Sequence, residues 1–181
     1  PGQWGGIRTH WVSANDSLIF RNVVMEYGGG GLGLSDIPAG DLRYGTIGHV
    51  NTCQGTILLD AVTLRESRLY GVATACALTM TNSVITQAYG AGVISTGGDT
   101  RVTGSRISSS GWGLEVTGSA TLVDVRGTRI TGNFGRAVVT NVLSLNALQD
   151  LPADSLLGNA SDVIEVQGNG NLTTRDLFLD R

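Results

Sequence analysis

The sequence predicts an all-β protein, a right-handed parallel β-helix solenoid with coils of about 21–23 residues, a period within the range of known repeat architectures. Three observations support this fold class: a composition suited to short strands and tight turns, an aliphatic residue that recurs once in each coil, and a glycine–aliphatic pair that recurs with a similar period. Each coil of such a solenoid buries its apolar side chains only by stacking on its neighbours.

The composition fits many short strands joined by turns. The 181 residues include 27 Gly but only 3 Pro, while 41% are hydrophobic and 15% are charged. A disordered glycine-rich chain would also be poor in Val, Ile and Leu, and this chain is rich in them. The length suffices for one sizeable core. We therefore expect a single β-helix domain over residues 1–181.

An aliphatic column marks the coils. Its members are Leu64, Ile85, Ile107 and Ile130, whose spacing matches the coil length and grows by one position at each step. When coils stack about 4.8 Å apart, residues with this spacing lie above one another and form an inward row. The column therefore predicts the core of one face of the helix.

A second column has a similar period. The pairs at 71–72, 92–93 and 113–114 are Gly-Val, Gly-Val and Gly-Leu, and the interval is the same from each pair to the next. The frame of leucine-rich repeats is missing, and helical repeats need a longer period and helix formers. The coil is therefore expected to contain three short strands separated by tight turns.

Corners between these strands are indicated three residues before the aliphatic column. Asn82, Gly104 and Gly127 occupy that place in three successive coils. Asn and Gly tolerate the left-handed backbone angles that a sharp corner requires.

The repeat is less regular near its beginning. Residues 18–25 have the pattern of a coil, and an inserted loop follows over about 28–53, with one strand near 46–50. Insertions in solenoids usually leave from one face, which is often the face that binds.

The pattern weakens again over about 141–181. Residues 148–157, with a proline at 152, predict a loop or a short helical turn, and residues 163–166 predict the start of another strand.

Three segments carry a resemblance to a known class of proteins. The opening Pro-Gly-Gln-Trp-Gly-Gly-Ile at 1–7, the stretch at 18–29 and the end at 159–174 are similar to large secreted bacterial surface proteins with right-handed, pectate-lyase-like β-helix repeats. The resemblance implies an extracellular or cell-surface location and an incomplete section of a longer helix. Its motifs concern the fold and carry no catalytic residue.

The charge of the chain limits its partners. The formal net charge is −3, and all 12 basic side chains other than His are Arg. Nucleic acid is not expected as a partner without a basic excess. Membrane insertion is not expected either, because no apolar run approaches the roughly 20 residues that span a bilayer. A polysaccharide or another surface partner is the partner we expect.

Polar residues cluster in the inserted loop. Carboxylates beside an Arg and a His can bind calcium and a uronate, or perform acid/base chemistry. The alternative is an ordinary polar surface loop. Apart from calcium at this place, no metal or cofactor is expected. The cluster comprises Asp36, Asp41, Arg43, Tyr44 and His49.

Other candidate residues occupy neighbouring coils. Arg106 and Arg129 fall at equivalent positions, where two guanidinium groups can share an anion or, alternatively, face solvent and pair with carboxylates. Cys53 and Cys76 are separated by close to one coil length, and they either form a disulfide or remain two buried thiols.

Aromatic side chains are a further candidate feature. Trp4, Trp11 and Trp112 can stack on sugars if they are exposed, or else cover the core.

The expected function is a non-catalytic segment of an extracellular surface protein that acts as a stalk, an adhesin or a glycan-contact module. Polygalacturonase signatures are present only as fragments, at 48–50 and 129–131, and no acidic residue recurs down one column. The alternative is a polysaccharide lyase or glycoside hydrolase with part of its site in the inserted loop. The fold alone does not distinguish them, because β-helices host both.

Overall fold

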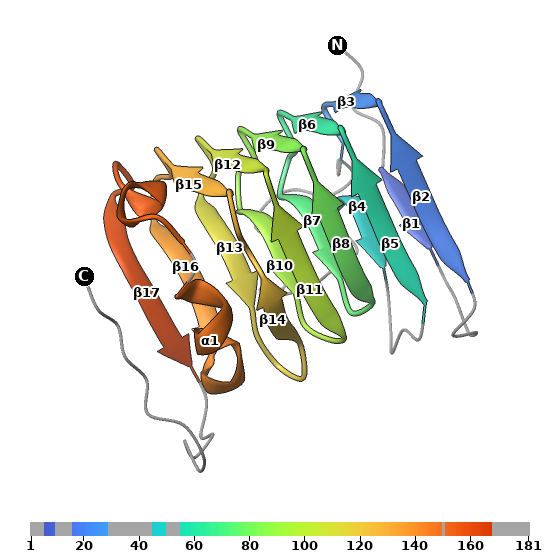
Figure 1. Ribbon diagram of the computed structural model, residues 1–181. Helices are drawn as coiled ribbons and strands as arrows, with labels where there is room; N and C mark the ends of the chain where they lie inside the picture. Colours follow the sequence, from blue (N-terminus) through green and yellow to red (C-terminus); the bar gives the residue numbers. More distant parts are fainter. Residues whose placement is uncertain (1–5, 10–15, 29–44, 50–54, 150, 168–181) are drawn as a thin grey trace.

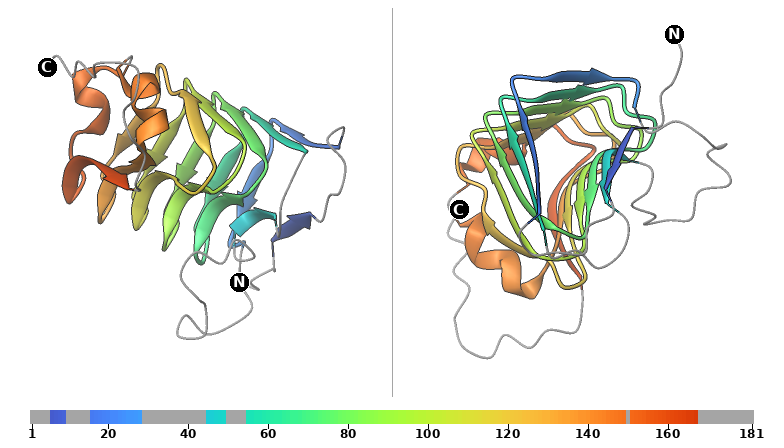
Figure 2. Two further views of the ribbon diagram at one scale, coloured as in Figure 1. Left: turned by 90° about the horizontal axis from the view of Figure 1, so that it is seen from below. Right: turned by 90° about the vertical axis from the view of Figure 1, so that its right-hand side faces the viewer.

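The computed structural model describes residues 6–9, 16–28, 45–49, 55–149 and 151–167 (Figure 1). These residues form a right-handed parallel β-helix of about five coils. The right-hand view of Figure 2 looks roughly along the stack and shows the coils superimposed around a common interior. The fold class predicted from the sequence is confirmed.

Three parallel sheets form the walls of the helix. Sheet A consists of β1 (Ile7–Thr9), β4 (Gly45–His49), β7 (Tyr70–Thr74), β10 (Ala91–Ser95), β13 (Trp112–Val116), β16 (Arg136–Asn141) and β17 (Ser161–Gln167). Sheet B consists of β2 (Ser17–Arg21), β5 (Thr56–Asp60), β8 (Ala77–Thr81), β11 (Asp99–Thr103) and β14 (Thr121–Asp124). Sheet C consists of β3 (Val24–Glu26), β6 (Thr63–Arg65), β9 (Val84–Thr86), β12 (Arg106–Ser108) and β15 (Arg129–Thr131).

The aliphatic column lies in sheet C. Its four predicted members pair in register and are each 0 or 1% exposed, and Met25 continues the row by one coil. Burial of such a side chain stabilises the folded chain by about 1.5 to 3 kcal/mol, so each coil gains stability from its member of the column. The predicted column is confirmed.

The glycine–aliphatic column lies in sheet A, and its aliphatic members face the same core. The glycines have a separate function. A Cβ atom on Gly71, Gly92 or Gly113 would overlap Cγ2 of the isoleucine that faces it from sheet C. Glycine therefore allows sheets A and C to approach closely, which narrows the cross-section of the helix.

Hydroxyl side chains tie the coils together at the corner between sheets B and C. Ser83 Oγ accepts a hydrogen bond from the N–H of Val62 at 3.0 Å, and Ser105 Oγ accepts one from the N–H of Ser83 at 3.1 Å. Thr128 continues the ladder by accepting from the N–H of Ser105 at 3.3 Å. Each hydroxyl also donates to a carbonyl of β8 or β11. Turn N–H groups inside the helix are thus satisfied without water.

The left-handed corners predicted before the aliphatic column are confirmed. Asn82, Gly104 and Gly127 have φ angles of 49°, 56° and 66°. Asn22 and Ala61 continue the same corner in earlier coils with φ angles of 53° and 52°. Even an alanine adopts this conformation here, because the neighbouring coils fix the path of the backbone.

Within the predicted insertion, β4 joins sheet A between β1 and β7 and agrees with the strand expected near 46–50. Residues 29–44 and 50–54 lie outside the described residues.

The irregular C-terminal part covers the last strands of sheets B and C. It contains η3 (Val142–Ser144), α1 (Leu145–Leu148) and η4 (Ala153–Leu156), followed by β17. Segments η3 and α1 contact β14, and η4 contacts β15. The helical region begins at Val142, before the predicted 148–157, because Leu145 and Leu148 both reach the core.

Candidate functional site: an aromatic ledge

The turn from sheet C to sheet A repeats one backbone conformation in successive coils. Glu66, Gln87, Ser109 and Gly132 directly follow β6, β9, β12 and β15, and their φ angles are 56°, 57°, 54° and 67°. A left-handed residue at this place bends the chain sharply from sheet C toward sheet A. The turns therefore follow similar paths, and equivalent side chains project from the same side of the helix.

A buried polar ladder fixes the floor of this turn. Ser110 Oγ accepts a hydrogen bond from the N–H of Ala88 at 3.2 Å, and Asn133 Oδ1 accepts one from the N–H of Ser110 at 3.0 Å. Asn159 Oδ1 accepts one from the N–H of Asn133 at 3.0 Å. The amides of both Asn residues also donate to carbonyls of the isoleucine column. Because this position points inward, the next residue of each turn faces solvent.

The outward position carries large aromatic side chains. Tyr89 is 68% exposed and Phe134 is 77% exposed, and Gly111 occupies the equivalent place in the coil between them. Trp112, the first residue of β13, is 43% exposed. We call Tyr89, Trp112 and Phe134 the aromatic ledge. Three exposed aromatic rings on consecutive coils form the kind of apolar surface that often marks a binding site.

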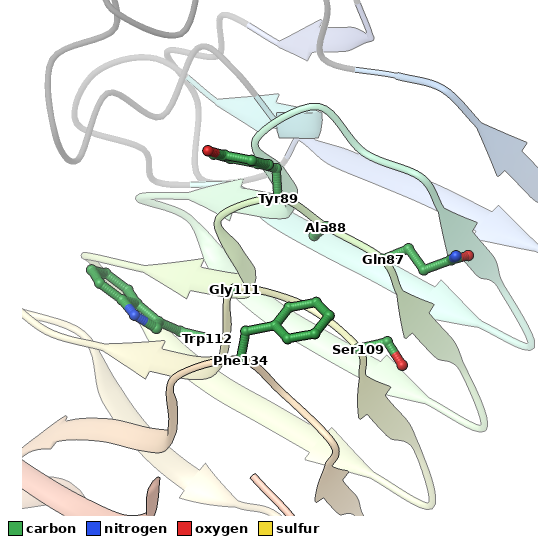
Figure 3. A pocket seen from close by; sticks show the side chains of 7 residues that line it. All are labelled: Gln87, Ala88, Tyr89, Ser109, Gly111, Trp112 and Phe134. Atoms are coloured by element: carbon green, nitrogen blue, oxygen red, sulfur yellow. The ribbon is translucent and has the colours of Figure 1, made fainter. Parts of the chain in front are cut away.

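The ledge borders an open pocket of about 670 Å³. Figure 3 shows Trp112 on one side of the pocket, with Gln87 and Ser109 on the other. Concave sites with aromatic walls and a few polar groups are typical of small-molecule and glycan binding. The described lining residues are Gln87, Ala88, Tyr89, Ser109, Gly111, Trp112 and Phe134.

Two residues of the following coil hold the Trp112 ring. A Cβ atom at Gly135 would overlap Cδ1 of the indole, so glycine provides the space in which the ring lies. The guanidinium carbon of Arg136 lies 6.0 Å from the ring centroid, at the outer limit of a cation–π contact. Arg136 Nε is in turn 2.8 Å from Glu165 Oε2. The ring is thus supported from its own sheet.

Glu115 lies on the same strand as Trp112 and points out of sheet A. It stands in register between Ile94 and Val139, which are both buried. Burial raises the pKa of Glu115; Arg136 opposes this shift and Glu165 adds to it. Glu115 Oε2 is inaccessible to solvent and has no hydrogen-bond partner among the described residues. A partly buried carboxyl of this kind favours its protonated form more than an exposed one does.

The predicted cluster of the inserted loop is placed only in part. Residue His49 ends β4, and its side chain lies outside the described residues. The other members, Asp36, Asp41, Arg43 and Tyr44, lie outside the described residues altogether.

Arg106 and Arg129 are neighbours in register on β12 and β15, and both are exposed. Arg129 Nη2 lies 3.8 Å from Asp154 Oδ2, and both side chains are well exposed. Exposed ion pairs of this length contribute little to stability. Neither arginine lines the pocket.

Cys76 is fully buried and takes part in a disulfide. Cys53, the other cysteine of the chain, lies outside the described residues, as do Trp4 and Trp11. Of the three tryptophans, Trp112 is the one whose surroundings are described.

Sequence reasoning missed Tyr89, Phe134, Gln87 and Ser109 as site residues. A signal was present, because Tyr89 and Phe134 each lie four positions after a member of the isoleucine column. Residues at a fixed distance from a core column must fall on one side of a solenoid.

Comparison of the chain with protein-family models, with curated proteins and with solved structures finds no match. Among the described residues, no helix combines the length and the apolar character needed to cross a bilayer. The same residues contain no group of three or more His, Cys, Asp or Glu side chains placed to hold a metal ion.

Proposed function

We propose that this chain is a non-catalytic glycan-contact module of an extracellular β-helix protein, and that the aromatic ledge is its binding surface. The observation that carries the proposal is the exposure of Tyr89, Trp112 and Phe134 around one pocket. Contact of exposed aromatic rings with water is unfavourable, so a ligand that covers the rings binds with a gain in free energy.

Sugars fit this chemistry well. A pyranose ring presents C–H groups on its faces and hydroxyl groups around its rim. Aromatic side chains offer flat apolar surfaces for the faces, while the Gln87 amide and the Ser109 hydroxyl can exchange hydrogen bonds with the rim. The ledge places both kinds of group around a single pocket.

The extracellular location rests on two supports. The resemblance of residues 1–7 and 18–29 to secreted bacterial surface proteins is one of them. The disulfide at Cys76 is the other, because such bonds persist mainly in oxidising compartments.

The test is a glycan-binding screen of the chain and of two variants. Affinity electrophoresis in gels that contain soluble polysaccharides should show retardation of the wild-type chain and loss of that retardation in Trp112→Ala and Tyr89→Ala. Leu143→Ala is a matched control, because this apolar side chain is 70% exposed but lies in η3, away from the ledge. A wild-type chain that binds no glycan would leave only a role as a stalk.

A second candidate function is glycan cleavage. Glu115 and Glu165 stand on the outer face of sheet A, two coils apart in register, and Arg136 is ion-paired with Glu165. Two carboxyls in different environments can divide acid and base roles. The test uses a polysaccharide that retards the chain in the gel. Release of reducing ends or unsaturated products by the wild type, and loss of this release in Glu115→Gln, would favour cleavage over simple binding.

A further inference from the structure

Among the residues that the structure describes, the lining of the pocket at the ledge carries no charge. The described lining residues contribute an amide, two hydroxyls, aromatic rings and backbone, but no carboxylate, guanidinium or imidazole. An anionic sugar that enters this pocket loses hydration of its charge and meets no cation among the described lining residues. The lining therefore disfavours uronates and sulfated sugars.

The described charges on the Trp112 side of the pocket point the same way. On the Trp112 side, the described charged groups are Glu115, Arg136 and Glu165, which is one more carboxyl than guanidinium. Arg136 is already engaged by Glu165 and by the Trp112 ring. A polyanion would find no unengaged cation among these described groups, whereas a neutral chain needs none.

The spacing of the rings defines the direction of the ligand. Tyr89 and Phe134 occupy the same position of coils that are two steps apart, with Gly111 between them. Two steps correspond to about 9.6 Å at the usual strand separation, which exceeds the reach of one sugar ring. A ligand that covers both rings must therefore be an oligomer that runs along the helix axis.

We propose that the ledge binds an uncharged, linear oligosaccharide that lies along the helix axis and covers Tyr89 and Phe134 at the same time. This inference deepens the proposed function and rests on it. Trp112 forms the side wall, and Gln87 and Ser109 bond the hydroxyl groups of the sugar chain.

Isothermal titration calorimetry tests both parts of the inference. The probes are the hexamers and dimers of β-1,4-linked glucose and of β-1,4-linked N-acetylglucosamine, with hexagalacturonate as the anionic match. At least one neutral hexamer should bind, and hexagalacturonate should bind at least about tenfold more weakly because its charges remain uncompensated.

Chain length reports the direction of binding. Tyr89→Ala and Phe134→Ala should each lower the affinity for the hexamer that binds roughly three- to tenfold. The affinity for the dimer should fall less than about twofold in either variant. A dimer covers only one ring at a time, so it can bind at the ring that remains. Equal losses for the dimer and the hexamer would overturn the axial arrangement.

Gln87→Lys is a variant that should gain affinity for the anionic hexamer. The new ammonium group stands at the rim of the pocket and should bring hexagalacturonate binding to within about twofold of the neutral hexamer. Leu143→Ala remains the control and should leave all affinities unchanged.

The outcomes separate this inference from the proposed function. Wild-type binding of hexagalacturonate as tight as that of the neutral hexamers would overturn the uncharged class and keep the ledge as a glycan site. Failure of every oligosaccharide would remove both proposals. Sedimentation analysis that shows a dimer dissociated by Tyr89→Ala would assign the ledge to a second copy of the chain instead.

Discussion

The two turns that flank sheet C both bend the chain and satisfy buried N–H groups with side chains, but they differ in length. At the corner between sheets B and C, two residues separate β8 from β9; at the turn between sheets C and A, four residues separate β9 from β10. Both turns contain a left-handed residue and a buried side chain that accepts an N–H from the previous coil. Only the longer turn leaves a further position that faces solvent.

That extra position is where the aromatic ledge arises. In the short corner both turn residues have a structural task, since Asn82 makes the left-handed bend and Ser83 joins the ladder. In the long turn Gln87 makes the bend and Ala88 faces inward, so Tyr89 is unconstrained by the fold. A repeat protein can thus place function on a residue that its core does not need.

The largest effect is expected from breaking the ladder of the long turn. Asn133 is 2% exposed, and its side chain bonds to three residues of neighbouring coils. Asn133→Ala leaves the Ser110 N–H unsatisfied and should lower the free energy of unfolding by about 2 to 4 kcal/mol, measured by urea denaturation. The exposed Asn146 of α1 supplies the control, Asn146→Ala, which should stay within about 0.5 kcal/mol of the wild type. Equal losses in both variants would show that the ladder is not special.

The short corner should lose stability without losing binding. Ser105→Ala removes one rung of the ladder between sheets B and C and should cost about 1 to 2 kcal/mol. Because this corner is remote from the pocket, the glycan affinity of the folded variant should equal that of the wild type. A reduced affinity at full folding would mean that the two corners are coupled.

Gly135→Ala should separate the geometry of the ledge from its stability. The added methyl group overlaps the Trp112 ring and the carbonyl oxygen of Gly111, so the pocket wall must shift and glycan affinity should fall several-fold. Gly132→Ala is the matched control: its φ angle of 67° makes alanine cost about 1 to 2 kcal/mol, but nothing lies within 4 Å of the new Cβ. Calorimetric titration of both variants should show loss of affinity in Gly135→Ala alone.

The smallest expected effects depend on pH and have opposite signs at the two regions. Arg126 holds the pKa of Asp124, beside the short corner, at about 2, so this stability is present above the usual range of Asp and is lost as the pH falls toward 2. Burial raises the pKa of Glu115, near the ledge, so its contribution is present at low pH and is lost as the pH rises through the raised pKa.

Urea denaturation from strongly acidic to neutral pH checks both signs. Asp124→Asn should flatten the acidic limb of the stability curve, and Glu115→Gln should flatten the decline above the ordinary pKa of a carboxyl group. A Glu115→Gln curve parallel to that of the wild type would contradict the role assigned to this carboxyl.

Most of the fold could be predicted because burial repeats with the coil. Ile85, Ile107 and Ile130 stand at one position of successive coils, and a register error would expose all of them together. The end of the core was harder to predict, because Leu145 and Leu148 follow helical spacing for only one turn. A single helical turn leaves no periodicity to detect.

The candidate site was less accessible to sequence reasoning. The charged residues of the inserted loop are candidates from the sequence alone, because carboxylates and His have recognisable chemistry. Tyr89 and Phe134 have none, and their importance depends on a shared position in two coils that are not adjacent. Gly111 stands at the same position in the coil between them, so no aromatic residue recurs there from one coil to the next. The offset from the isoleucine column becomes a useful signal only once the backbone path shows that this position faces solvent.

The in-register stacking of β10, β13 and β16 makes the ledge a ruler with one division per coil. Insertion of one whole coil between Trp112 and Phe134 would lengthen the distance from Tyr89 to Phe134 by one division and leave the stacked core chemically the same. Recognition length can therefore change through duplication of a segment, without redesign of any residue that contacts the ligand.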